Sequence, residues 1–460
     1  MSVKNTVKKI TADVWLNVLI VGLLAALLAQ CAVYLVEYAH MGKTSGDIPF
    51  EMQMLSTSAT DSRRSLDAAM LQPACIGITA DGKTSVVMNS AAVVDEIYTD
   101  VSRCLFEAMQ NDAVSVSENM WQQALQQDAY VYLQYPNELP YQVIFAFAAA
   151  KAESDVQIRR ADSYIGVREV ILTADTEGNL TQILVRGGEN VYAFSLDTAI
   201  RMDVFTAYPL AYSEVFYNGT MDDLGTHTEF VTTEKISARD IYASVGGTSM
   251  LRANPNHLEN LFRLLNFNPD KLRYHIEADG TYVYVESHGI LRMDTRTIAY
   301  TAAEQGGVSL SKIVGQDASG DIYTYLRAAS YIVGRLNDMD NQYTGGDAQL
   351  RLTSVSAVNG SVTLDFAFYS DNVEIYTKSG NSGLSISFTG ETISKISFEM
   401  IVVRRSLSEH RLMLQAWSKK QLAGSSPAIM RLIYRMDAED IAISAEWMAQ
   451  LVRVEERGRR

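Results

Sequence analysis

An unbroken apolar run, with no charged side chain, covers residues 14–36. At a rise of about 1.5 Å per residue, a helix of this length matches a hydrocarbon core of roughly 30 Å. A helix in a water-soluble core needs one apolar stripe and not an apolar surface on every side. The run therefore predicts one transmembrane helix. Its strongly polar residues, Asn17 and Gln30, are either tolerated in the bilayer or bond to a partner helix there.

The charges beside this run predict its orientation. Lys4, Lys8 and Lys9 precede it, and Asp13 is the one acid beside them. The positive-inside rule then places residues 1–13 in the cytoplasm as a short tail and the bulk of the chain outside.

A removable leader is the alternative to a permanent anchor. A cleavable signal peptide has an apolar region of about 7–15 residues and a cleavage site of small residues. The run here is longer, and Gln30 stands directly before Cys31, where a lipoprotein signal has a small residue. We therefore expect an uncleaved, single-pass cell-membrane anchor.

After the anchor, alternating apolar positions and turn residues predict short strands. Asp81-Gly82 separates two such runs, residues 74–79 and 84–89, and predicts a hairpin. Ser90 can cap a helix whose apolar residues recur at helical spacing over 93–109.

The next segments continue this mixture of helix and strand. A short helix is expected over residues 117–125 and a strand over 129–134. Residues 135–140 contain two prolines and are expected to break that strand.

Hairpins dominate the middle of the chain. A three-stranded meander is predicted over residues 168–174, 180–185 and 190–196. An amphipathic helix over 256–266 precedes a second group of strands. That group is predicted over 271–277, 281–286, 290–293 and 297–302.

The last third repeats the order of helix and then sheet. A helix is predicted over residues 321–336. Four strands are predicted over 349–358, 362–369, 383–388 and 393–403. Residues 428–435 are expected to form a helix and residues 441–452 a closing strand.

Strands and helices that do not alternate regularly predict an α+β fold of antiparallel sheets packed with helices. We expect two or three extracytoplasmic domains after the anchor. The predicted divisions are a stalk over 37–60, an N-terminal α+β domain over 61–160, a hairpin-rich α+β domain over 161–305 and a C-terminal α+β domain over 306–455.

Charge and cysteine content narrow the possible functions. The formal net charge is −15, and no basic stripe offsets it, so a nucleic-acid partner is not expected. Cys75 and Cys104 leave two alternatives open, a disulfide outside the cell or two buried thiols.

Reactive residues do not gather into a recognisable catalytic or metal-binding motif. His275 and His288 fall on neighbouring predicted strands, but a third ligand is missing. The Ser-x-x-Lys pattern at 309–312 lacks its companion motifs. A calcium-loop-like start at 338–342 has Tyr343 where the loop requires Gly. We therefore predict no enzyme activity, no catalytic, cofactor-binding or metal-binding residue, and no cofactor.

Tyrosines at alternate strand positions allow two interpretations. They are Tyr130, Tyr132 and Tyr135, and later Tyr282 and Tyr284. Either they pack against a helix, or they form an exposed aromatic surface for a protein partner.

Two segments resemble the YycH/YycI family. Residues 250–300 contain the helix NHLENLFRLLNF and then the hairpins KLRYHIEADGTYVYVESHGILRMDTRTIAY. Residues 130–144, YVYLQYPNELPYQVI, resemble the family's strand followed by a Pro-Glu-Leu-Pro segment. The order of tail, span and α+β ectodomain is also similar. These motifs are structural, and the family has no catalytic or ligand-binding residue to carry over.

The resemblance implies a regulatory function, since the family consists of single-span proteins of Gram-positive bacteria. Members of that family accompany a cell-wall sensor histidine kinase and alter its signalling through transmembrane and extracytoplasmic contacts. We therefore expect a non-enzymatic regulator whose partners are the membrane, the kinase and a second accessory membrane protein. An extracytoplasmic ligand-binding or wall-binding protein of envelope assembly or sporulation is the alternative, and it needs a concave pocket. A divergent wall hydrolase would need a carboxylate pair, and no pair stands out.

Overall fold

The structure is a computed structural model of the 460-residue chain. Contacts divide it into two compact units, Met1–Thr57 and Ser58–Arg460. The structure describes residues 66–152, 165–187, 190–196, 200–208, 236–245, 255–271, 273–304, 306–315, 318, 320–344, 347–377, 383–412, 428–436 and 442–451. The predicted tail 1–13, anchor 14–36 and stalk 37–60 lie outside these residues. Within them, no helix is both long enough and apolar enough to cross a bilayer.

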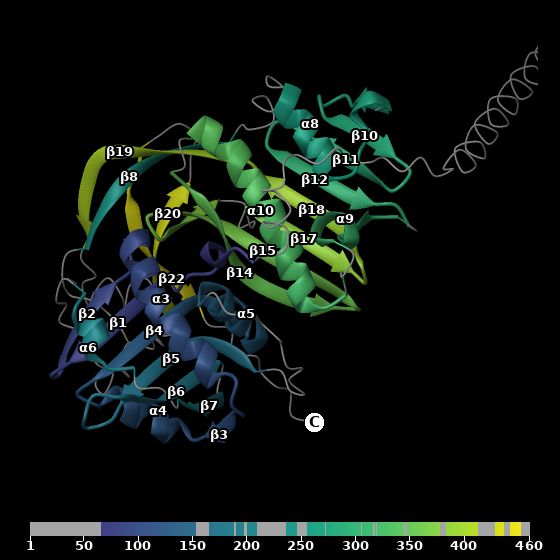
Figure 1. The fold of residues 1–460 in the computed structure, drawn as a ribbon. Coiled ribbons are helices and arrows are strands. Elements are labelled where there is room, and N and C mark those ends of the chain that lie inside the picture. The colour runs from purple at the N-terminus through teal and green to yellow at the C-terminus, as the bar shows by residue number, and fades with distance from the viewer. Residues whose placement is uncertain are drawn as a thin grey trace, which may run out of the picture. The chain divides into compact units, whose positions relative to one another are not determined.

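The first sheet is antiparallel, with strand order β2-β1-β4-β5-β6-β7-β3 (Figure 1). Its strands are β1 (Cys75–Ala80), β2 (Lys83–Val87), β3 (Val114–Val116), β4 (Tyr130–Pro140), β5 (Gly166–Ala174), β6 (Leu180–Gly187) and β7 (Asn190–Ser195). The predicted hairpin at Asp81-Gly82 is confirmed, since β1 pairs with β2 around it and both turn residues have positive φ.

Helices cover both faces of the first sheet. On one face lie α3 (Ala91–Ala108) and α5 (Tyr141–Lys151), whose apolar residues join the large core. On the other face α4 (Glu118–Leu125) packs Trp121 against Tyr130 and Tyr132. Residues Val143–Ala149 of α5 are all buried, because this helix lies against α3 and also contacts α10. The short helix η1 (Ala68–Met70) contacts α5 and β14, and the short helix α6 (Asp203–Thr206) contacts β1.

Ser90 stands at the N-cap of α3 with extended backbone, as predicted, but its side chain makes no capping hydrogen bond. The burial of one helix face against the sheet therefore contributes most to the stability of α3.

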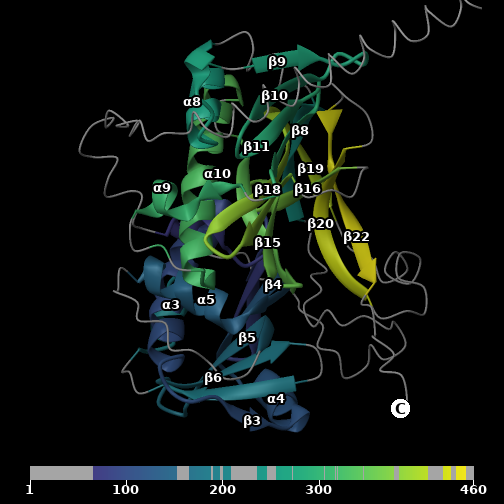
Figure 2. The same cartoon turned by 90° about the vertical axis from the view of Figure 1, so that its right-hand side faces the viewer.

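The central sheet has twelve strands, ten of them in the order β22-β20-β16-β15-β17-β18-β12-β11-β10-β9. In chain order these ten are β9 (Arg273–Ile276), β10 (Tyr282–Glu286), β11 (Gly289–Met293), β12 (Thr297–Ala302), β15 (Ser361–Ser370), β16 (Val373–Thr377), β17 (Leu384–Thr389), β18 (Thr392–Glu399), β20 (Ala428–Met436) and β22 (Ala445–Leu451). Two more strands attach to this path, β13 (Val308–Ser309) to β18 and β14 (Gln349–Val358) to β15. In Figure 2, β9 lies at one end of the sheet, beyond β10.

Within the described residues, the helices beside the central sheet are α8 (Pro255–Leu264), α9 (Leu310–Val314) and α10 (Ile322–Thr344). The ring of Tyr325 on α10 stacks on Phe388 with centroids 4.7 Å apart, and Phe262 on α8 meets Tyr284 at 4.8 Å. The 3₁₀ turn η4 (Pro269–Lys271) follows α8. A separate three-stranded sheet consists of β19 (Ile401–Leu412), β8 (Ile236–Val245) and β21 (Ala442–Ile443).

The predicted α+β class is confirmed. The sheets run across both predicted domain divisions, since β4 pairs with β5 across 160/161 and β12 pairs with β18 across 305/306.

Two local predictions are wrong. Residues 428–435 form strand β20, which pairs in parallel with β16 and antiparallel with β22. The apolar residues of this short run fit the spacing of a helix and that of a strand equally well. Pairing with distant strands makes it a strand. Residues 135–140 continue β4, because a register shift between Gln134 and Leu139 accommodates the prolines without breaking the strand.

A buried ionic network ties α4 to the first sheet. Tyr132 donates its hydroxyl hydrogen bond to Glu169 Oε1 at 2.5 Å. Arg186 donates to Glu169 Oε2 from Nε at 2.7 Å and lies 4.5 Å from the ring centre of Trp121. Glu169 is 6% exposed, so these partners offset the cost of burying a carboxylate.

Replacing Glu169 by Ala should lower the free energy of unfolding by roughly 3 kcal/mol, because Arg186 loses its buried partner. Glu259→Ala is the matched control: its pair with Arg263 is exposed, and the expected change is below about 1 kcal/mol. Urea unfolding followed by tryptophan fluorescence measures both. Equal effects of the two substitutions would contradict a structural role for the network.

Candidate functional site

A cluster of buried polar side chains lies where the β15–β16 hairpin meets the first sheet. Asp371 and Asn372 form the tip of this hairpin with φ of 48° and 69°, a left-handed conformation that Asn and Asp adopt more readily than other non-glycine residues. The reversal brings Asn372 against β1 and the end of β2. Its Nδ2 donates to the carbonyl oxygens of Pro73, Ala74 and Met88, each at 3.3 Å.

Arg351 on β14 fixes the other side of this amide. Its Nη1 donates to Asn372 Oδ1, and its guanidinium carbon lies 5.1 Å from the ring centre of Tyr369. Burial lowers the pKa of Arg351 to about 10, so the side chain remains a cation at neutral pH. The amide oxygen of Asn372 therefore accepts from a cation while its nitrogen donates to carbonyls.

A second buried pair stands beside this amide. Glu374 on β16 accepts hydrogen bonds from the Tyr369 hydroxyl at 3.1 Å and from Nη2 of Arg431 on β20. Burial, followed by the negative charge of Glu374, raises the pKa of Tyr369 well above its usual range. Burial alone would lower the pKa of Arg431, but Glu374 and Tyr369 raise it. The carboxylate of Glu374 therefore accepts a hydrogen bond from each of the other two side chains.

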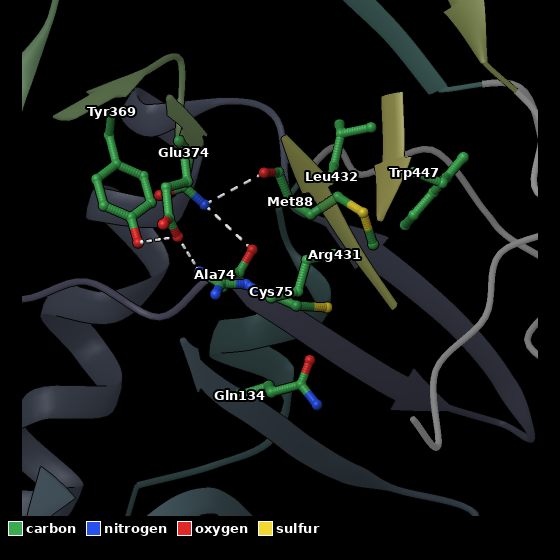
Figure 3. A pocket seen from close by; sticks show the side chains of 10 residues that line it. Ala74, Cys75, Met88, Gln134, Tyr369, Glu374, Arg431, Leu432 and Trp447 are labelled. Carbon is green, nitrogen blue, oxygen red and sulfur yellow. Dashed lines mark hydrogen bonds and ion pairs between the residues drawn. The ribbon is translucent and has the colours of Figure 1, made fainter. Parts of the chain in front are cut away.

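A small cavity of about 40 Å³ lies among these residues (Figure 3). It is lined by Ala74, Cys75, Met88, Gln134, Tyr369, Asn372, Glu374, Arg431, Leu432 and Trp447. The volume suits a few water molecules, far below the roughly 300 Å³ of a small-molecule pocket. Gln134 is buried at this wall and its Nε2 makes no hydrogen bond within the described chain. A water molecule in the cavity is the natural partner for that group.

The cavity does not supply the groups needed for nucleophilic or acid–base catalysis. Burial raises the pKa of the Cys75 thiol to about 12, so it stays protonated and weakly nucleophilic at neutral pH. Glu374 is engaged by Arg431 and Tyr369. In the described ranges, no three His, Cys, Asp or Glu side chains group closely enough to hold a metal ion. We therefore interpret this cluster as a joint between two sheets.

The residues singled out from the sequence are dispersed. Asn17 and Gln30 lie outside the described residues. Cys75 and Cys104 are buried free thiols, which decides between the two cysteine alternatives. His288 faces the carbonyl of Leu265 at 2.9 Å, and burial lowers its pKa.

The tyrosines fall into two classes. Tyr130 and Tyr132 pack under α4, and Tyr135 lies in the opposite core, 3.0 Å from the Tyr98 hydroxyl. The packing interpretation holds for these three. It also holds for the second class, since Tyr284 is buried against Phe262 of α8 and Tyr282 is partly buried on the same core. The exposed ring is that of their neighbour Tyr274 on β9, whose centre lies 6.3 Å from that of Tyr282 and 5.7 Å from that of Tyr284.

We call the exposed surface at this end of the sheet the β9 edge. It consists of Tyr274 and Ile276 on the face that carries Tyr284, and of Val285 and Ile290 on the opposite face; these residues are 59%, 53%, 44% and 40% exposed. β9 ends the strand order of the central sheet, and all four of its side chains are exposed. An apolar edge strand of this kind is suited to contact with another protein chain. Sequence reasoning missed Tyr274 and Ile276, although their strand was predicted.

Comparison with known proteins supports the fold. No protein-family model matches the sequence, and no match is found among curated proteins. Among solved structures, the chain is similar to YycH from Bacillus subtilis, with a TM-score of 0.52 and 12% identity over 84% of this chain and 96% of that chain. An uncharacterized protein from Eubacterium rectale covers 48% of this chain and 80% of its own, with 10% identity and a TM-score of 0.30, too low to carry an inference. The likeness to YycH confirms the predicted resemblance at the level of the fold.

Asn372→Gly should lower the free energy of unfolding by about 2 kcal/mol, since it keeps the left-handed turn and removes the amide. Asn372→Ala should cost about 1 kcal/mol more, because Ala disfavours positive φ. Urea unfolding measures both, and Asn359→Gly, at another turn residue with φ of 51°, serves as the control. A stability unchanged in the Asn372 variants would show that the joint does not hold the sheets.

Cys75 and Cys104 should resist maleimide at pH 8 in the folded chain and react in urea. Burial raises the pKa of each thiol from 9.0 to about 12. Because the folded thiols hold protons that the unfolded thiols lose, their contribution to stability falls as pH rises from 9 to 12. Peptide mapping by mass spectrometry separates these cysteines from Cys31. Rapid labelling of either buried thiol under native conditions would contradict its burial.

Proposed function

We propose that this chain is a membrane-anchored extracytoplasmic regulator of a sensor histidine kinase of cell-wall homeostasis. The fold likeness to YycH, which extends over 84% of this chain, carries the proposal. The function is the one that the YycH/YycI resemblance implies.

The chemistry of the described residues supports a role in protein contact. At the sheet joint, Arg351 bonds to Asn372, and Tyr369 and Arg431 bond to Glu374. The cavity there is too small for a metabolite. The β9 edge, in contrast, presents aromatic and aliphatic side chains to solvent.

The proposed function includes a membrane topology. The apolar run 14–36 anchors the chain with its N-terminus in the cytoplasm, and the ectodomain stands outside. Asn17 and Gln30 are the proposed contacts with a partner helix in the bilayer. The ligand-binding or wall-binding alternative needs a larger concave site than the cavity of about 40 Å³.

Deleting the gene should change the expression of the wall-hydrolase genes that the kinase controls, and the full-length chain should restore it. Crosslinking in membranes should trap the kinase. The double variant Asn17→Leu, Gln30→Leu should recover roughly fivefold less kinase, as expected for the loss of about 1 kcal/mol of interhelical hydrogen bonding. Leu24→Ile is the control within the same helix. Unchanged gene expression together with no trapped kinase would refute the proposed function.

A further inference from the structure

We propose that β9 pairs with β9 of a second copy of this chain, antiparallel and about a two-fold axis at His275. This inference goes beyond the proposed function, because it concerns contact between two identical chains and does not depend on the kinase. The pairing joins two central sheets into one continuous sheet.

The backbone of β9 is arranged for such pairing. Glu277 N–H donates to Thr281 O at 2.9 Å, toward β10. In an antiparallel ladder, alternate residues direct their backbone groups to the same neighbour. The β9–β10 register has no shift between Glu277 and His275. The backbone N–H and C=O groups of His275 therefore also point toward β10. Tyr274 and Ile276 must then direct their N–H and C=O groups away from β10, to the outer side of the sheet.

A two-fold axis at His275 places the outward N–H and C=O groups of the two copies opposite one another. Tyr274 of the first copy then faces Ile276 of the second, and by symmetry Ile276 of the first copy faces Tyr274 of the second. Each pair can exchange both N–H···O bonds of an antiparallel ladder. β9 has neither a proline nor a bulge, which natural edge strands use to prevent such pairing.

The side chains are complementary in the same register. On the face that α8 covers, Tyr274 would contact Ile276, and these are among the most exposed large apolar residues of the described chain. On the opposite face, Arg273 of each copy would stand opposite Glu277 of the other, a carboxylate that also pairs with Arg292 of its own chain at 3.2 Å. This matters in a chain with a net charge of −15, where two random surfaces would repel.

Neighbouring registers are less favourable. An axis at Tyr274 would bring Arg273 opposite His275, which removes the pairing of opposite charges. An axis at Ile276 would extend the ladder into the turn that contains Asp279 and Gly280, where Gly280 has φ of 89°. The axis at His275 is therefore the one that combines backbone pairing, apolar contact and facing opposite charges.

The register can be tested by cysteine crosslinking of the full chain in membranes, with Cys31→Ser as the background. His275→Cys should crosslink to itself, because the Cα atoms of a facing non-hydrogen-bonded pair are about 4.5 Å apart, within disulfide range. The expected yield is at least about tenfold above that of Val358→Cys, since a facing pair meets the distance limit and an unrelated surface does not. Val358 is a suitable control because it is 64% exposed and lies at the end of β14.

A second set of variants distinguishes crosslinks formed in this register from crosslinks formed by random encounters between chains. Tyr274→Cys alone should remain at the control level, because two residues of offset place its copies roughly 9 Å apart. Co-expression of Tyr274→Cys with Ile276→Cys should form a mixed crosslink. Adding Ile276→Lys to His275→Cys should reduce the self-crosslink at least about fivefold, since Lys at an edge opposes pairing.

Mass spectrometry of the crosslinked band identifies its two chains. A His275→Cys yield equal to that of Val358→Cys would overturn the proposal, as would strong self-crosslinking of Tyr274→Cys or capture of a different protein by His275→Cys. Loss of kinase crosslinking with an intact self-crosslink would refute the proposed function and leave this inference standing.

Discussion

The packing of the first sheet against the central sheet depends on one left-handed chain reversal. Asp371 and Asn372 turn the β15–β16 hairpin so that a single amide reaches three carbonyl groups of a segment almost 300 residues earlier. Arg351 holds the other end of that amide. Backbone carbonyls buried at such a seam are costly without donors, so the joint selects one arrangement of the two sheets. Arg405 reinforces it from β19 through its ion pair with Asp371 at 2.9 Å.

This use of polar groups explains why the interior does not resemble an active site. Glu374, Arg431 and Tyr369 have the chemical types of a catalytic cluster, but each hydrogen-bonds to another member of the set. Burial also keeps the nearby Cys75 thiol protonated at neutral pH. On the surface, the β9 edge presents exposed apolar side chains on the strand that ends the order of the central sheet.

Local features were predictable from the sequence, and long-range features were not. The hairpin at Asp81-Gly82 and the helix Ala91–Ala108 follow from turn chemistry and helical spacing. The strand Ala428–Met436 does not, because its short apolar run suits helix and strand equally until β16 and β22 flank it. Asn372 marks a turn, but nothing nearby in the chain indicates its distant carbonyl partners. Similarly, the exposure of Tyr274 depends on where its sheet ends, which only the assembled sheet determines.

The parallel pairing of β16 with β20 has a consequence for biosynthesis. Glu374 emerges from the ribosome more than fifty residues before Arg431, the cation that accompanies it in the folded sheet. Until the later strand arrives, the carboxylate cannot enter the interior without a large desolvation cost. The seam between the sheets can therefore close only after β20 has been translated. A product truncated before β20 would retain an open, charged seam, which makes it a ready substrate for quality-control proteases.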